Sequence, residues 1–141
     1  MIGRGVFDNQ TIELAKPQTY MNLSGEAVSC LIAKDDRAVE KLIVVSDDLA
    51  LPFGTIRVRP KGTHGGQNGL RSIIDCLKTQ EFIRVRIGIQ PDHPVTDASR
   101  FVLENFAKSD AETLRNVLDD ATDAIETIVS NGVDEAMSKF N

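Results

Sequence analysis

Residues 53–89 read FGTIRVRPKGTHGGQNGLRSIIDCLKTQEFIRVRIGI. Two segments of this stretch, 53–60 and 82–89, alternate between aliphatic side chains and arginines, which predicts strands with one apolar face each. Between them, Leu70–Leu77 places apolar residues at helical spacing. The order strand, loop, helix, strand predicts an α/β architecture at the centre of the chain.

The loop Lys61–Leu70 carries four glycines, one histidine and two amide side chains within ten positions. Glycine is favoured where the backbone takes positive φ or approaches a ligand closely. Backbone N–H groups, amides and neighbouring guanidinium groups together suit a polyanion such as an RNA end. A tight connection between a strand and a helix is the other interpretation of the same pattern.

The first 32 residues predict a β-hairpin followed by a helix. The turn signal Asp8-Asn9 separates two extended segments. Residues 27–32 carry an apolar stripe at helical spacing, and we expect Thr19 or Asn22 to cap that helix.

A short aliphatic run, Leu42–Val45, is typical of a strand covered on both faces. We expect this strand to end at Ser46-Asp47-Asp48. Ligands of open α/β sheets gather beyond the carboxyl ends of strands. A carboxylate there can orient a catalytic histidine, bind a metal or cap the next turn, and the pattern alone leaves these alternatives open.

Helical patterns fill the C-terminal part, at Ala98–Asn105, Asp110–Ser130 and Val133–Lys139. The resulting order β-β-α-β-β-α-β-α-α-α predicts a mixed β-sheet flanked by helices in a three-layer sandwich. If strands 53–60 and 82–89 are neighbours, four guanidinium groups stand on one face of that sheet.

Length and composition fit one soluble domain over residues 1–141. No signal peptide is visible, and the longest aliphatic run, 42–45, is far too short for a membrane span. We interpret Cys30 and Cys76 as reduced core residues of a cytoplasmic protein, which we expect to be a monomer.

The chain has a net charge of −5, but one of its segments is basic. Residues 57–86 carry seven Lys or Arg and two Asp or Glu, whereas residues 87–141 carry four Lys or Arg and eleven Asp or Glu. The local field steers a charged ligand more than the total charge does. The basic segment therefore indicates a nucleic-acid contact, although a solvated pair of strands balanced by an acidic helix would give the same count.

Several common catalytic patterns are missing from the sequence. It has no G-x-x-x-x-G-K-[ST], no G-x-S-x-G, no H-E-x-x-H and no cysteine pair at zinc spacing, so we expect neither a metal nor a cofactor. Its only histidines are His64 in the glycine-rich loop and His93 in an expected surface loop.

Five segments together resemble the bacterial-type peptidyl-tRNA hydrolases. They are KPQTYMNLSG at 16–25, VVSDDLALPFG at 44–54, RVRPKGTHGGQNGLRSI at 57–73, FIRVRIGI at 82–89 and FVLENF at 101–106. The matching segments follow in the family's order and cover nearly the whole chain.

The resemblance implies hydrolysis of the ester between a peptide and the 3′-terminal ribose of tRNA. In that family a histidine acts as general base, and an aspartate that matches Asp47 orients it. Asn22 and Asn68 match the asparagines that bind the substrate and stabilise the oxyanion, and Tyr20 matches a residue of the substrate cleft. Basic residues of 57–86 would hold the tRNA phosphates: Arg57, Arg59, Lys61, Arg84 and Arg86.

The sequence departs from the family pattern at its beginning. The family's G-L-G-N-P-G loop and the segment carrying the catalytic histidine are not found, so we expect a chain that is incomplete at its N-terminus and has little activity alone. A truncated chain, a mis-set gene start, a short paralogue and a chain completed by another segment remain open. A non-catalytic RNA-binding module on the same fold is the alternative function, and His64 recruited as a substitute base is a further one.

Overall fold

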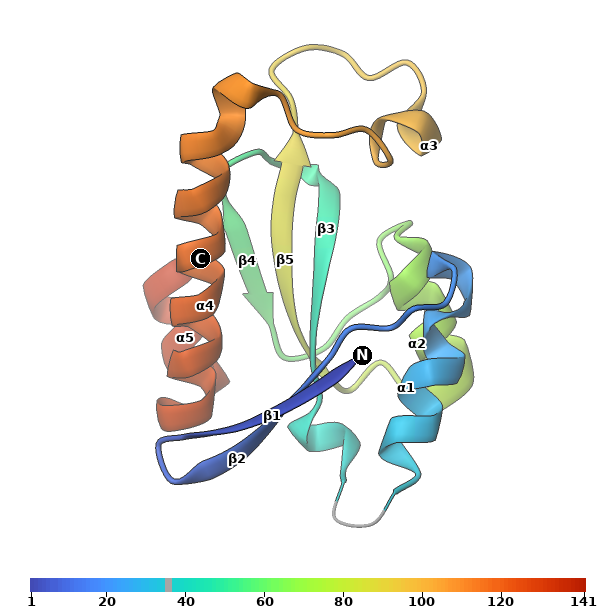
Figure 1. The fold of residues 1–141 in the computed structure, drawn as a ribbon, viewed down its shortest axis with the longest axis vertical. Helices are drawn as coiled ribbons and strands as arrows, with labels where there is room; N and C mark the ends of the chain where they lie inside the picture. Colours follow the sequence, from blue (N-terminus) through green and yellow to red (C-terminus); the bar gives the residue numbers. More distant parts are fainter. Residues whose placement is uncertain (35–36) are drawn as a thin grey trace.

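The structure is a computed structural model that describes residues 1–34 and 37–141. The elements follow the order β, β, α, β, β, α, β, α, α, α, with three additional 3-10 turns (Figure 1). Their bounds are β1 Ile2–Phe7, β2 Gln10–Ala15, α1 Ser24–Ile32, β3 Ile43–Pro52, β4 Ile56–Arg59, α2 Asn68–Leu77, β5 Ile83–Gln90, α3 Ala98–Phe101, α4 Ala111–Asn131 and α5 Val133–Phe140; the turns are Met21–Leu23, Val39–Lys41 and Lys108–Asp110.

The central sheet has the strand order β3-β5-β4, with β5 parallel to β3 and antiparallel to β4. This confirms the mixed sheet expected from the sequence. Arg57 stands opposite Arg86 and Arg59 opposite Arg84 in the β4–β5 register. The four arginines therefore share one face, because residues paired across a ladder point to the same side.

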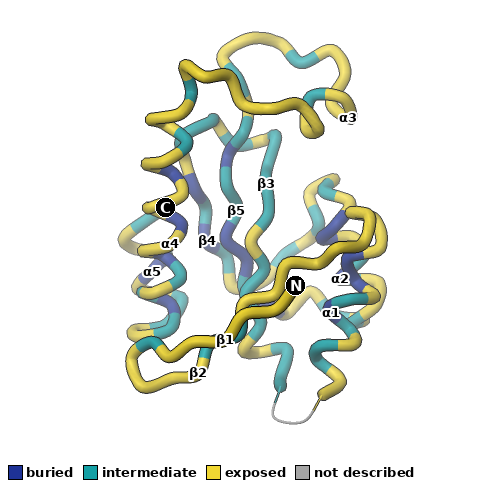
Figure 2. The backbone as a smooth tube through the Cα atoms, viewed as in Figure 1, coloured by how far each residue is buried: buried dark blue, intermediate teal, exposed yellow. Residues whose placement is uncertain are grey.

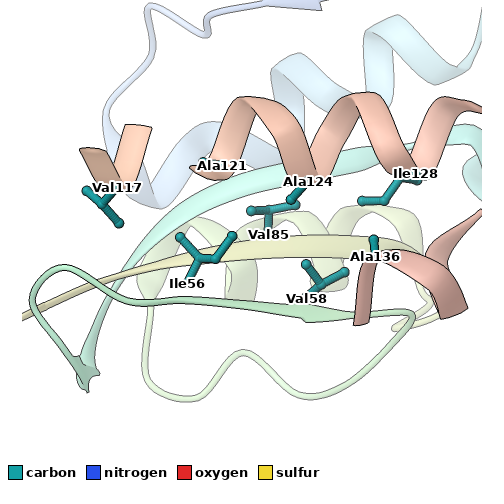
Figure 3. Packing of buried hydrophobic residues seen from close by; sticks show 8 residues of the cluster. All are labelled: Ile56, Val58, Val85, Val117, Ala121, Ala124, Ile128 and Ala136. Carbon is teal, nitrogen blue, oxygen red and sulfur yellow. The ribbon is translucent and has the colours of Figure 1, made fainter. Parts of the chain in front are cut away.

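Helices cover both faces of this sheet, α4 and α5 on one side and α1 and α2 on the other (Figure 1). Figure 3 shows the larger apolar cluster, which joins the sheet to α4 and α5. Its buried members are Ile56, Val58, Val85, Val117, Ala121, Ala124, Ile128 and Ala136. A second cluster, built from Val28, Leu70, Ile73 and Phe82, joins α1 and α2 to the other face. The three-layer sandwich is confirmed.

The N-terminal hairpin is present and pairs β1 with β2 in a two-stranded sheet of its own. Its turn residues Asp8 and Asn9 have φ of 48° and 58°, the left-handed values that a two-residue hairpin turn requires. The tip is tied to the helical layer because Gln10 Nε2 donates to the carbonyl of Val129 at 2.9 Å. Most of the hairpin is exposed (Figure 2).

The expected end of the third strand at residues 46–48 is wrong. β3 continues through both aspartates, which pair with Ile87 and Gly88 of β5, and it shows a register irregularity before Pro52. A carboxylate is tolerated inside the strand when its charge has a partner. Asp47 accepts a hydrogen bond from Gln67, and Asp48 pairs with Arg86. Neither partner is close in the sequence, so local patterns could not reveal them.

Two other local expectations are also wrong. Neither Thr19 nor Asn22 caps α1, because the 3-10 turn Met21–Leu23 leads directly into the helix and Leu23 occupies the N-cap without a side-chain hydrogen bond. Cys30 and Cys76 are free and exposed instead of lying in the core.

Candidate functional site

Asp47 and Gln67 meet at the junction between β3 and the start of α2. Gln67 Nε2 donates to Asp47 Oδ1 at 3.0 Å, and Gln67 Oε1 accepts from the backbone N–H of Leu70 at 2.7 Å. The second contact makes Gln67 the N-cap of α2, a role usually filled by shorter polar side chains. One amide therefore connects the end of a helix to a half-buried carboxylate.

The neighbouring aspartate has a different environment. Asp48 Oδ1 accepts from the backbone N–H of Ala50 at 2.8 Å, and Asp48 Oδ2 forms an ion pair with Arg86 Nε and Nη2. The Asp48 side chain is only 10% exposed. Both of its oxygens thus have protein partners, whereas the described residues supply no hydrogen bond to Asp47 Oδ2.

The glycine-rich loop uses its glycines for backbone conformation. Gly65 and Gly66 have φ of 57° and 85°, the left-handed region where a side chain is strained. His64 Nδ1 accepts from the Gly66 N–H at 2.9 Å, and the His64 carbonyl accepts from the Gln67 N–H at 3.0 Å. His64 therefore organises the turn that delivers Gln67.

Both predicted asparagines follow residues that contact each other. Met21 Sδ lies 3.6 Å from Gln67 Nε2, and Asn22 and Asn68 are the next residues in the chain. Both asparagines are exposed. The structure therefore brings the segments of Asn22, Asp47 and Asn68 together around the Gln67 amide. Tyr20 precedes this group and is 83% exposed.

The basic residues differ in accessibility. Lys61 is exposed and forms a 3.6 Å ion pair with Glu81, while Arg57, Arg59 and Arg86 are half-buried. Arg57 Nε is buried and has no hydrogen-bond partner among the residues described. An unpaired buried guanidinium donor is costly unless a ligand satisfies it.

Arg84 does not fit its predicted role as a phosphate contact, because it is only 2% exposed. Its Nη1 donates to the Thr63 carbonyl at 2.9 Å, its Nη2 donates to the Gln80 carbonyl at 3.0 Å, and its guanidinium lies 4.4 Å from the centroid of the Phe82 ring. Burial, followed by the charge of Arg86, lowers the pKa of the Arg84 guanidinium. Arg84 thus stabilises the glycine-rich loop through its bond to the Thr63 carbonyl. The alternating pattern of β5 could not distinguish this buried arginine from Arg86.

His93 is exposed, and its Nδ1 lies 3.2 Å from the Pro94 carbonyl. Neither it nor His64 forms a hydrogen bond with Asp47 within residues 1–34 and 37–141. In the same described ranges no group of three or more His, Cys, Asp or Glu side chains is arranged to hold a metal ion. The chemistry available at the junction is a carboxylate, several amides and nearby guanidinium groups.

Comparison with known proteins identifies the family. The family described as Peptidyl-tRNA hydrolase matches residues 1–141. The chain belongs to the peptidyl-tRNA hydrolase family. It is 43% identical over 141 residues to the peptidyl-tRNA hydrolase of Solibacter usitatus and 45% identical over 142 residues to that of Koribacter versatilis. All of this chain is covered in both matches, against 72% and 71% of the two relatives.

A solved peptidyl-tRNA hydrolase structure has the same fold as this chain. The crystal structure of peptidyl-tRNA hydrolase from Acinetobacter baumannii superposes with a TM-score of 0.88 at 31% identity. The match covers 98% of this chain and 70% of that one. The chain thus spans 70–72% of the length of these relatives, and the comparisons do not show the expected truncation.

The family is one of hydrolases that act on ester bonds, as the resemblance implied. Sequence reasoning missed Gln67, which lies at the centre of the site. Its only signal was its place just before a helical pattern, next to Asn68. No helix in the part of the chain that the structure describes has both the length and the apolar character needed to cross a membrane.

Proposed function

We propose that the junction around Asp47 serves the hydrolysis of the ester between a peptide and the 3′ ribose of tRNA. The observation that carries this proposal is the difference between the two neighbouring aspartates. Asp48 has partners on both oxygens, whereas the described residues hold the Asp47 side chain through Oδ1 alone. A half-buried carboxylate with one oxygen fixed and the other unoccupied is suited to orient an imidazole.

The remaining residues fit around that carboxylate. Asn22 and Asn68 would donate hydrogen bonds to the substrate and to the oxyanion that develops on the ester carbonyl. Tyr20 would contact the terminal part of the substrate. Arg57, Arg59, Lys61 and Arg86 would bind tRNA phosphates, and the unpaired Nε of Arg57 supports an anionic ligand on that sheet face.

We further propose that these 141 residues alone hydrolyse the ester slowly, because neither His64 nor His93 bonds to Asp47 in the part of the chain that the structure describes. His64 is an unsuitable substitute, since its Nδ1 already accepts from Gly66. Ester hydrolysis with water needs a base and a stabilised oxyanion, so the proposed reaction uses peptidyl-tRNA and water without a metal or cofactor. The cytoplasmic location and the monomeric state stay predictions.

Addition of imidazole would test the proposal. The chain is incubated with peptidyl-tRNA labelled in the peptide, with and without imidazole, and release of the peptide is followed. We expect slow hydrolysis that imidazole accelerates in the unaltered chain but not in Asp47→Asn. Family-level hydrolysis without imidazole would contradict the missing base, and no acceleration at any imidazole concentration would contradict the role of Asp47.

A non-catalytic RNA-binding function is the second candidate, favoured by the basic residues on β4 and the loop that follows it. It predicts that affinity for a tRNA acceptor minihelix falls steeply with salt and is unchanged in Asp47→Asn. Binding by itself fits both functions. Tight minihelix binding together with no imidazole-dependent hydrolysis would favour the binding function.

A further inference from the structure

We propose that Gln67 is a positioning residue that fixes which oxygen of Asp47 faces the reacting groups. This inference rests on the proposed function, because it assigns Gln67 a task in the same reaction. Gln67 would touch neither the ester nor the water. It would act through Asp47 and through the helix that begins at the next residue.

The orientation of the Gln67 amide is set by its contact with α2. A glutamine amide can be turned by 180°, which exchanges its oxygen and its nitrogen. Here the Leu70 N–H donates to Oε1 at 2.7 Å, so the oxygen must face the helix. The Nε2 group is consequently directed at Asp47 Oδ1, 3.0 Å away. The N-cap contact thus determines the polarity of the contact with the carboxylate.

The Asp47 carboxylate receives the donor that this orientation provides. A donor on Oδ1 restricts rotation of the Asp47 side chain and leaves Oδ2 as the acceptor for an imidazole N–H. Asp48 shows the contrasting case, since Arg86 and Ala50 occupy both of its oxygens. Of the two aspartates, only the one bonded to Gln67 keeps an oxygen for a further partner among the described residues.

The two asparagines each follow a residue that takes part in these contacts. Asn68 follows Gln67 directly, so the bond to Asp47 also sets the distance between the start of α2 and β3. Met21 Sδ contacts the same Nε2 at 3.6 Å and precedes Asn22. Packing leaves little freedom here, because a Cβ on Gly69 would stand 2.5 Å from Met21 Sδ and 3.0 Å from Gln67 Oε1. The Gln67 side chain therefore links the segments that carry Asn22, Asp47 and Asn68.

The two contacts of Gln67 can be separated by substitution. Gln67→Ser keeps an oxygen that can cap α2 but is too short to reach Asp47. Gln67→Glu keeps the length and the cap but replaces the donor with a second carboxylate. We expect Gln67→Ser to melt close to the unaltered chain and to lose about tenfold in the imidazole-dependent rate, the equivalent of one positioning hydrogen bond. We expect Gln67→Glu to lose more.

A comparison of two bases distinguishes positioning from a structural effect. Imidazole can donate its N–H to Asp47 Oδ2, whereas N-methylimidazole has no N–H to donate. We expect the unaltered chain to prefer imidazole, and Gln67→Ser to accelerate equally with both bases. A Gln67→Ser chain that keeps both the rate and the preference would overturn the inference.

The hydrogen bond is also measured without turnover, which keeps the outcome separate from that of the proposed function. In an NMR spectrum the Gln67 side-chain N–H resonances should shift when Asp47 is changed to Ala. If the resonances shift but imidazole never accelerates hydrolysis, the contact exists and the proposed function fails. If they do not shift, Gln67 does not position Asp47, whatever the activity.

Discussion

The side chain of Asn141 forms two hydrogen bonds with the backbone of Val58. The Val58 N–H donates to Asn141 Oδ1 at 2.7 Å, and Asn141 Nδ2 donates to the Val58 carbonyl at 3.0 Å. Val58 lies on β4, an edge strand of the sheet, and is fully buried. The amide therefore imitates one residue of a neighbouring strand and satisfies groups that an edge strand leaves open.

Replacing Asn141 with Ala should consequently lower the free energy of unfolding by about 1–2 kcal/mol, because it leaves two buried backbone groups without partners. Denaturant-induced unfolding measures the effect. Asn141→Asp is the matched control, since it keeps the acceptor for the Val58 N–H and should lose less. Equal stability of the Ala variant and the unaltered chain would show that water replaces the amide.

Arg84 and Lys61 should respond differently to substitution. Arg84→Met removes the donors to the Thr63 and Gln80 carbonyls in a buried place, and we expect it to cost about 2–4 kcal/mol of stability. Lys61→Ala should leave stability unchanged and reduce the salt dependence of minihelix binding by about one phosphate contact. Unfolding curves and binding isotherms at several salt concentrations test both variants.

If Arg84→Met had normal stability but bound the minihelix more weakly, Arg84 would be a direct RNA contact after all. The sequence could not settle this point. Arg84 and Arg86 occupy equivalent positions in an alternating strand. Arg84 donates to the Thr63 carbonyl of the loop before α2, whereas Arg86 pairs with Asp48 of β3. Both partners lie more than 20 positions away along the chain.

The sequence predicted those parts of the fold that depend on periodicity and turn chemistry. The hairpin at Asp8-Asn9 and the arginine faces of β4 and β5 are local or nearly local patterns, and the structure contains them. The continuation of β3 through Asp47 was not predictable, because it depends on partners about 20 and 40 positions away along the chain. The same reason explains why Gln67 was missed, because its bond to Asp47 joins residues 20 positions apart in the chain.

Close packing between α1 and α2 makes Gly25 sensitive to a single methyl group. A Cβ at this position would lie 2.1 Å from the Ser72 carbonyl oxygen, and the Gly25 N–H donates to Ser72 Oγ at 2.9 Å. We expect Gly25→Ala to cost about 2–3 kcal/mol, since the helices must separate. Gly5→Ala is the control, because a Cβ there meets no atom within 4 Å.

The stability measurement for these two glycine variants is thermal or denaturant-induced unfolding. A displaced α1 would also move Met21 and Asn22 relative to α2, so Gly25→Ala should lower any imidazole-dependent hydrolysis as well. Unchanged unfolding of Gly25→Ala would mean that the helices have room to shift without loss of contacts.

The N-terminal hairpin should lose stability in acid. Arg4 Nε donates to Glu13 Oε2 at 2.8 Å, and Arg37 donates to the same carboxylate at 2.7 Å. The hydrogen bond from Arg4 is the main cause that lowers the pKa of Glu13 below its ordinary value of 4.5; the charge of Arg37 adds to it, and desolvation opposes it. Because the folded pKa is the lower one, the unfolded chain binds the proton first as the pH falls.

The contribution of Glu13 is therefore complete above pH 4.5 and is lost as the pH falls through the folded pKa. An NMR titration of the Glu13 carboxyl carbon should show the lowered pKa, and Arg4→Gln should return it toward 4.5. Protection of the β1 and β2 amides from hydrogen exchange, measured against unstructured peptides at the same pH, should fall over this pH range in the unaltered chain. It should change less in Glu13→Gln, which has no charge to lose. If the pKa of Glu13 were the same in Arg4→Gln as in the unaltered chain, the ion pair between Arg4 and Glu13 would not form in solution.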